Sequence, residues 1–215
     1  MLEVRGFTFN AFQENTWVIS SQGEAMIIDP GCYDRAEQSL LDEHIRTSGL
    51  RVKYLINTHG HIDHVLGNAH VSSAYGVPVM IHELDVPVLQ AVKAYAFNYG
   101  FPNYAEAPAE GRLNEGQILT LGDTSCSVMF LPGHAPGHTG LYFEQEQKIF
   151  SGDVLFEQSI GRTDLPGGDF DTLIRSIREK LFKLPEETMV YPGHGDTTTI
   201  GSEKRNNPFC SINPS

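Results

Sequence analysis

The chain has 215 residues and a formal net charge of −12 at pH 7, with 40% apolar and 20% charged residues. This length supports a substantial core without covalent staples, and we expect a single domain over residues 1–215. The acidic balance argues against nucleic acid as a partner, because nucleic-acid binders need a basic surface to displace counterions.

The cysteine pattern and the N-terminus predict a cytoplasmic protein. Cys32, Cys126 and Cys210 are odd in number and widely spaced, which indicates reduced thiols. A reactive thiol at Cys32 is the alternative for that residue. Residues 1–10 alternate polar and apolar side chains and predict a strand, not a signal peptide. No stretch approaches the roughly 18 apolar residues of a membrane span, so no membrane is expected as a partner.

The first half of the chain predicts a meander of strands followed by alternating helices and strands. The predicted strands are 2–9, 16–20, 25–28, 52–56 and 77–81, and the predicted helices are 34–47, 65–75 and 84–96. A turn is predicted around residues 13–15. Residues 97–111 are rich in aromatic residues, Pro, Ala and Gly, and they predict a long irregular connection.

The second half repeats the pattern of hairpins followed by strands and a helix. The predicted strands are 118–121, 125–131, 141–143, 148–151 and 189–191, and the predicted helix is 169–181. The tail from residue 197 onward is polar and has few residues to bury. Two sheets with helices outside would bury the apolar residues of both halves, which predicts an α/β fold.

The stretch Thr58–His64 carries three imidazoles and a carboxylate directly after a predicted strand. Imidazole nitrogens and carboxylate oxygens are the ligands that zinc and similar divalent metals prefer. The spacing favours two metals, because His59 and His61 point the same way on an extended segment. Asp63 and His64 then face a second ion. Four ligands do not complete two coordination spheres, so others must come from elsewhere in the chain.

Three later loops offer such ligands, each beside a glycine and after a short apolar run. Their candidate ligands are His134, Asp153 and His194. Glycine lets the backbone approach a crowded centre closely and adopt positive φ angles. The three loops therefore predict the remainder of a metal site.

These motifs together resemble the metallo-β-lactamase-fold hydrolases. The resemblance is carried by His59-x-His61-x-Asp63-His64, Gly133-His134, Gly152-Asp153 and Gly193-His194, in this order. It extends from about Asn15 to His194. It implies an αββα sandwich, with two mixed sheets packed face to face, helices outside and the site between the edges of the sheets. This fold agrees with the predicted order of strands and helices.

The resemblance also implies a set of metal ligands and catalytic residues. The implied ligands are His59, His61 and His134 for one metal, Asp63, His64 and His194 for the second, and Asp153 as a bridge. Zinc is expected, with iron and manganese as alternatives, because all three accept His and Asp ligands. Asp63 and Asp153 are the expected catalytic residues, Asp153 bridging the metals together with a hydroxide and Asp63 orienting that nucleophile.

Finer features resemble the glyoxalase II branch of the family. Gly161-Arg162-Thr163-Asp164 is similar to the Gly-Arg/Lys loop of glyoxalase II and persulfide dioxygenase, so Arg162 is the expected substrate-binding residue. Asn207-Pro208-Phe209 is similar to the end of short bacterial glyoxalase II-like proteins. Only about twenty residues follow His194. Classical glyoxalase II has a helical C-terminal domain there, so we expect a more open substrate pocket.

The resemblance implies a metal-dependent hydrolase that cleaves S-acylglutathione, such as S-lactoylglutathione, through a hydroxide bridging the metals. The alternatives are a persulfide dioxygenase with a single iron on His59, His134 and Asp153, another hydrolase of this fold such as a phosphodiesterase or lactonase, and a non-enzymatic metal-binding scaffold. The expected partner is a small thioester, including glutathione conjugates. Both a monomer and a homo-oligomer are compatible with the sequence.

Several polar residues outside the implied ligand set have two interpretations. Asp29 is expected to accept a hydrogen bond from a ligand histidine, with a simple turn aspartate as the alternative. His138 is expected to hydrogen-bond within its loop, with metal binding as the alternative. Arg162 is either a substrate contact or the partner of Asp164 in an internal ion pair. The remaining histidines His44, His70 and His82 lack glycine-rich loops and are expected to be surface or packing residues.

Overall fold

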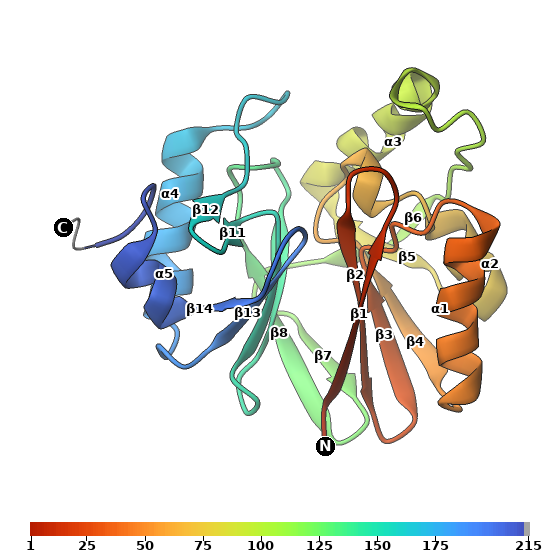
Figure 1. Cartoon of the computed structure of the whole chain (residues 1–215), viewed down its shortest axis with the longest axis horizontal. Helices are drawn as coiled ribbons and strands as arrows, with labels where there is room; N and C mark the ends of the chain where they lie inside the picture. The colour runs from red at the N-terminus through yellow and green to blue at the C-terminus, as the bar shows by residue number, and fades with distance from the viewer. Residues whose placement is uncertain (213–215) are drawn as a thin grey trace. The chain divides into compact units, whose positions relative to one another are not determined.

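The computed structural model describes residues 1–212, and the chain divides into two compact units. The first unit comprises residues 1–113 and 120–125, and the second comprises residues 114–119 and the chain from 126 onward. Each unit is built around a six-stranded mixed sheet with helices (Figure 1). The predicted α/β class with two mixed sheets is therefore confirmed.

The first sheet has the strand order β1-β2-β3-β4-β5-β6. Its strands are β1 (Glu3–Phe9), β2 (Glu14–Ser21), β3 (Glu24–Ile28), β4 (Arg51–Ile56), β5 (Val79–His82) and β6 (Ala109–Leu113). The first three strands pair antiparallel, and the strands from β3 to β6 pair parallel. Since β3 and β4 are parallel and Ile28 pairs with Ile56, the residues that follow these two strands lie at the same edge of the sheet.

Three helices pack against this first sheet: α1 (Arg35–Thr47), α2 (Asn68–Tyr75) and α3 (Val86–Tyr95). The carboxylate of Asp34 caps α1 by accepting hydrogen bonds from the first free backbone N–H groups of the helix. Apolar residues of the helices and strands form one buried cluster, which includes Leu41, Ile45, Val71, Leu89, Val92, Ile27 and Leu55. This packing fixes β4 and hence the start of the histidine loop.

The second sheet has the strand order β14-β13-β10-β9-β8-β7. Its strands are β7 (Ile118–Leu121), β8 (Thr124–Phe130), β9 (Thr139–Phe143), β10 (Lys148–Gly152), β13 (Met189–Pro192) and β14 (Thr198–Thr199). The strands β10 and β13 are parallel, and Gly152 pairs with Pro192. The loops that follow these two strands therefore start side by side.

The second unit also contains a small hairpin and two helices. The hairpin joins β11 (Leu155–Phe156) to β12 (Ser159–Ile160), and the helices are α4 (Phe170–Glu179) and α5 (Ile200–Asn206). Figure 1 shows both helices on the same side of the sheet. Their apolar residues Leu173, Ile177 and Ile200 are buried with sheet residues such as Ile149 and Val190.

Most predicted elements are present with bounds shifted by a few residues, and four predictions need correction. The turn predicted at residues 13–15 belongs largely to β2, which begins at Glu14. The helix predicted from residue 65 begins at Asn68, because the ligand candidates form a 3₁₀ turn, η1 (Ile62–His64). The predicted irregular connection contains η3 (Ala96–Tyr99) and the start of β6. The C-terminal tail, predicted to have few residues to bury, contains β14 and α5 and buries Thr198, Glu203, Asn207 and Cys210.

The structure also bears on the cysteines and on membrane insertion. No helix within residues 1–212 is long and apolar enough to cross a membrane. All three cysteines are free and buried. Burial raises the pKa of the Cys32 thiol, because the thiolate would lose its hydration. A reactive thiol at Cys32 is therefore disfavoured.

Candidate metal centre

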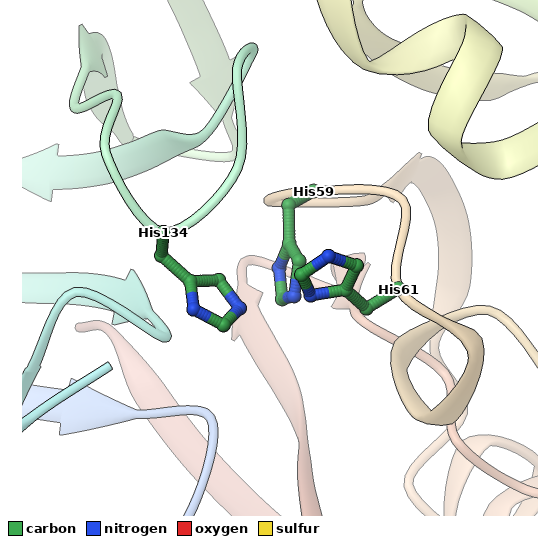
Figure 2. A group of neighbouring side chains, drawn as sticks. All are labelled: His59, His61 and His134. Carbon is green, nitrogen blue, oxygen red and sulfur yellow. The ribbon is translucent and has the colours of Figure 1, made fainter. Parts of the chain in front are cut away.

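The first unit contributes a compact group of imidazoles from the loop after β4. The rings of His59 and His61 have centroids 4.7 Å apart and are nearly perpendicular, and His59 and His64 have centroids 4.2 Å apart. His59 and His64 are fully buried. Figure 2 shows the side chains of His59 and His61 on this loop. Three imidazoles on one short loop offer several ring nitrogens as possible ligands.

Asp29 orients two of these rings. Its carboxylate accepts hydrogen bonds from the backbone N–H of Thr58 at 2.7 Å, from the Thr58 hydroxyl at 2.6 Å and from Nδ1 of His64 at 3.2 Å. Since the Thr58 hydroxyl donates to Asp29, its oxygen accepts from Nδ1 of His59, 3.0 Å away. With Nδ1 protonated, each neutral ring has an unprotonated Nε2 that can bind a metal.

The parallel pairing of β3 and β4 explains why Asp29 reaches this loop. The backbone N–H of Asp29 donates to the carbonyl of Ile56 at 2.8 Å, which continues the strand pairing by one step. Asp29 itself has a φ of 50°, in the left-handed region that is uncommon for residues other than glycine, although aspartate adopts it more readily than most. Such strain is common at functional sites, where the surrounding contacts impose it. Asp29 is thus an acceptor for a candidate ligand and not only a turn residue.

Polar residues outside the motif hold the histidine loop in place. The Asn57 side chain donates to the carbonyl of His64 at 3.1 Å. The carboxylate of Asp85, fully buried in η2 (Glu83–Asp85), accepts from the backbone N–H of Gly60 at 2.8 Å. A Cβ at Gly60 would lie 2.6 Å from the backbone nitrogen of Leu89, so only glycine fits at this position.

The turn between β1 and β2 is attached to the same loop. The side chain of Asn10 donates to the carbonyl of Asp63 and to the carbonyl of Gly31, both at 3.0 Å. Glu14 is fully buried nearby, and one of its carboxyl oxygens lies 3.9 Å from Nδ1 of His64. Burial raises the pKa of Glu14 well above its ordinary value, with the neighbouring Asp29 contributing in the same direction.

Aromatic side chains surround this turn. Phe12, at the tip, lies 6.3 Å from the ring of Tyr99 and 5.8 Å from that of Phe101, measured between centroids. Tyr95 contacts Tyr99 at 5.4 Å. Burial raises the pKa of Tyr95 to about 12, and the charge of Asp63 adds to this effect. Residues of the long connection thus place an aromatic group, partly exposed at Phe12 and Tyr99, beside the ligand loop.

The second unit brings two candidate imidazole ligands to the carboxylate of a third candidate, Asp153. Nε2 of His134 and Nε2 of His194 each lie 3.6 Å from the same oxygen, Oδ2, of Asp153. The pairing of β10 with β13 explains the second contact, because Asp153 and His194 follow these neighbouring strands and Gly193 N–H donates to the carbonyl of Gly152 at 2.9 Å. Asp153 is thus placed to share its carboxylate between two imidazoles.

Two further contacts orient these ligands. Nδ1 of His134 donates to the backbone carbonyl of Arg162 at 2.7 Å, which leaves Nε2 unprotonated in the neutral ring. The backbone N–H of Asp153 donates to Nε2 of His138 at 3.1 Å. His138 therefore uses Nε2 as a hydrogen-bond acceptor within its own unit and supports Asp153 through this contact.

The distances between candidate ligands fit a shared cation better than a direct hydrogen bond. The His64 Nε2 to Asp63 Oδ2 distance is 3.5 Å, and the two Asp153 distances are 3.6 Å. These are long for hydrogen bonds. Two ligands at about 2.0–2.1 Å from a tetrahedral metal are about 3.4 Å apart, which is close to these values. The donor sets of both units therefore fit divalent metal ions.

Arg162 has its guanidinium engaged by a neighbour. It forms two hydrogen bonds of 2.7 Å with the carboxylate of Asp164. This pairing lowers the pKa of Asp164 to about 2. Gly161, just before it, is tightly packed: a Cβ there would lie 1.9 Å from the carbonyl oxygen of Asp153. The internal ion pair between Arg162 and Asp164 is present. A role of the Arg162 side chain in substrate binding stays a prediction.

Sequence reasoning did not identify several of these supporting residues. Asn10, Glu14 and Asp85 lie far from the motif in sequence and carry no motif of their own. Glu14 stands in the polar run of residues 13–16, so the sequence carries no signal of its burial. Among the other histidines, His70 pairs with Asp42 at 3.1 Å, away from the ligand loops.

Known proteins resemble this chain over nearly its full length. The model of the metallo-beta-lactamase superfamily matches residues 9–194. Hydroxyacylglutathione hydrolase GloC of Haemophilus influenzae is 42% identical over 205 residues, covering 94% of each chain. The crystal structure of TTHA1623 in a di-iron-bound form has a TM-score of 0.85 and 38% identity, covering 96% of this chain and 100% of that one. The BLEG-1 B3 metallo-beta-lactamase has a TM-score of 0.87 and 37% identity, covering 98% and 99%. The chain therefore belongs to the metallo-beta-lactamase superfamily.

Proposed function

We propose that the protein is a metal-dependent thioesterase that hydrolyses S-acylglutathione, with S-lactoylglutathione as the first substrate to test. The observation that carries the metal-dependent part is the presentation of Nε2 by His59, His64 and His134, whose Nδ1 atoms are each held by an acceptor. The substrate is supported by the 42% identity to the enzyme named hydroxyacylglutathione hydrolase GloC.

The proposed ligands are those that the motifs of the superfamily imply for this sequence. His59, His61 and His134 would bind one divalent ion, and Asp63, His64 and His194 the other, with Asp153 shared between them. Support for sharing comes from Asp153 itself, whose Oδ2 lies at equal distances from two imidazoles. Zinc suits this set of ligands, and iron is equally compatible with it, as the di-iron form of TTHA1623 illustrates for that protein.

Two divalent ions bound there would supply a nucleophilic hydroxide at neutral pH and polarise the acyl carbonyl. The carboxylate of Asp63, beside Nε2 of His64, is placed to orient the attacking water through a hydrogen bond. The leaving group is a thiol with a pKa of about 8.5, so it departs as the thiolate and needs no general acid from the chain. This explains how the reaction proceeds with only metal ligands and their hydrogen-bond partners.

The test combines metal analysis with substrate assays on the purified protein. We expect two metal ions per chain and hydrolysis of S-lactoylglutathione. The loss of the thioester absorbance measures this hydrolysis. A β-lactam and glutathione persulfide serve as comparison substrates. Two bound metals without thioesterase activity would contradict S-acylglutathione as the substrate. Cleavage of the β-lactam would assign lactamase activity instead. Oxygen consumption with glutathione persulfide would assign a dioxygenase.

A further inference from the structure

The short hairpin β11–β12 connects the candidate ligands of the second unit. It begins two residues after Asp153 and ends at Ile160, immediately before the Gly161-Arg162 backbone whose carbonyl orients His134. Phe156 in this hairpin lies 6.2 Å from the ring of His194, edge to face. A shift of the hairpin would therefore move groups that contact all three ligands.

The tip of this hairpin is held by α5 and the residue after it. Gln158, at the tip, has a φ of 51°, and its backbone N–H donates to the carboxylate of Glu203 at 2.9 Å. The side chain of Asn207 donates to the carbonyl of Ser159 at 2.9 Å and to Glu203 at 2.8 Å. The hydroxyl of Thr198 donates to the other Glu203 oxygen at 2.6 Å.

The burial of Glu203 and Asn207 indicates that their hydrogen bonds to the hairpin have a structural role. Glu203 and Asn207 are both fully buried, although they lie in a polar tail. A buried carboxylate is costly unless it is hydrogen-bonded, and Glu203 accepts three hydrogen bonds. The hairpin has only two residues in each strand, too few to hold its position without outside contacts. Leu155 anchors the base of the hairpin in the buried apolar cluster, and Glu203 and Asn207 hold its tip.

We infer that Glu203 and Asn207 are positioning residues for the metal ligands of the second unit, acting through the β11–β12 hairpin. The inference rests on the proposed metal centre and extends it to the C-terminal segment. We expect α5 and Asn207 to hold the side chains of Asp153, His134 and His194 in the positions that metal binding requires. Neither Glu203 nor Asn207 belongs to the proposed set of metal ligands.

Variants at Glu203 test this inference directly. Glu203→Ala removes the acceptor for Gln158 and Asn207, so we expect zinc affinity to fall by ~10-fold, the low end for groups that support ligands. Glu203→Gln can turn its amide so that the oxygen accepts from Gln158 and Asn207 and the nitrogen donates to Thr198. We expect this variant to restore zinc binding. Asn207→Ala, which keeps the carboxylate, is expected to follow Glu203→Ala and serves as the second variant if that one does not fold.

The readouts are titration of the metal-free protein with zinc against a chelator and hydrogen exchange at the Gln158 amide. Glu186→Ala is the matched control, because the carboxylate of Glu186 pairs with Lys204 and Arg205 of α5, whereas that of Glu203 holds the hairpin. Ile177→Val, at a buried position of α4, lowers stability without touching the hairpin contacts of Glu203. It therefore controls for a general loss of stability.

The predicted result is weaker zinc binding and faster Gln158 exchange in Glu203→Ala and Asn207→Ala, with both controls like the wild type. Unchanged zinc affinity in folded Glu203→Ala would overturn the inference. An equal loss in Ile177→Val at a matched Tm would also overturn it, because it would show general destabilisation. A wild-type protein that binds no zinc, iron or manganese would instead overturn the proposed function, and this inference with it.

Discussion

Nδ1 of His134 donates to the backbone carbonyl of Arg162, while the Arg162 guanidinium is paired with Asp164. The backbone and side chain of one residue therefore contribute separately to the candidate site. Replacing the side chain leaves the carbonyl in place, so substitutions can separate ligand orientation from substrate binding.

Arg162→Ala is expected to keep both metals and to raise KM for S-lactoylglutathione, because it removes a cation beside a ligand loop. Asp164→Asn is the matched variant: it weakens the hold on the guanidinium and is expected to lower KM. Steady-state kinetics and metal content measure these effects. Unchanged KM in both variants would show that Arg162 serves only the internal ion pair.

Asp29→Asn is expected to weaken metal binding by ~10–100-fold, the usual range for groups that hydrogen-bond to ligand histidines. An amide cannot accept from Thr58 and His64 as the carboxylate does. Thr58→Val is the control, because it removes only the hydroxyl that links Asp29 to His59. Zinc competition titrations should show a smaller loss for Thr58→Val, and wild-type affinity in Asp29→Asn would contradict this role.

The sequence allowed good predictions where local chemistry determined the structure. The ligand loops were located because each follows an apolar strand, and parallel pairing of β10 with β13 then brings Asp153 beside His194. The strands and long helices were predicted from their periodicity. The 3₁₀ turn at Ile62–His64 was not, because a motif containing three histidines carries no period that distinguishes a tight turn from the start of a helix.

The remaining features depend on contacts between residues distant in sequence. Glu203 and Asn207 look like surface residues in a polar tail, and only the position of the β11–β12 hairpin makes them buried acceptors and donors. Glu14 is similar: its burial follows from the packing of the β1–β2 turn on the ligand loop. Single-sequence patterns contain no information on such pairings.

Phe12→Ala is expected to raise KM with little change in metal content. Phe12 is 41% exposed and its turn is tied to the ligand loop through Asn10 and Asp63. Covering part of such a ring with substrate contributes about 1 kcal/mol, which corresponds to a roughly 5-fold change in KM. Phe170→Ala, at a similarly exposed phenylalanine on α4, is the control. An equal KM in Phe12→Ala and the wild type would exclude this contact.

Glu24 supplies a pH-dependent contribution to stability. The backbone N–H of Gly122 and the ammonium of Lys53 lower the pKa of Glu24 from 4.5 to about 2. A lowered folded-state pKa stabilises the fold above the unfolded-state pKa, and this contribution is lost as the pH falls through the folded-state value. The Tm difference between wild type and Glu24→Gln should therefore shrink as the pH falls from about 5 to about 2. A constant difference would show that Glu24 acts through packing alone.

The metal content of the wild type and of Asp153→Ala, measured side by side by elemental analysis, tests the central claim most directly. Asp153 contacts the Nε2 atoms of two candidate ligands, so its loss should remove both metals together. His61→Ala is the comparison and should weaken one site more than the other. We predict two metal ions per chain in the wild type and neither retained in Asp153→Ala. A single metal in the wild type, or two metals retained in Asp153→Ala, would contradict the shared centre.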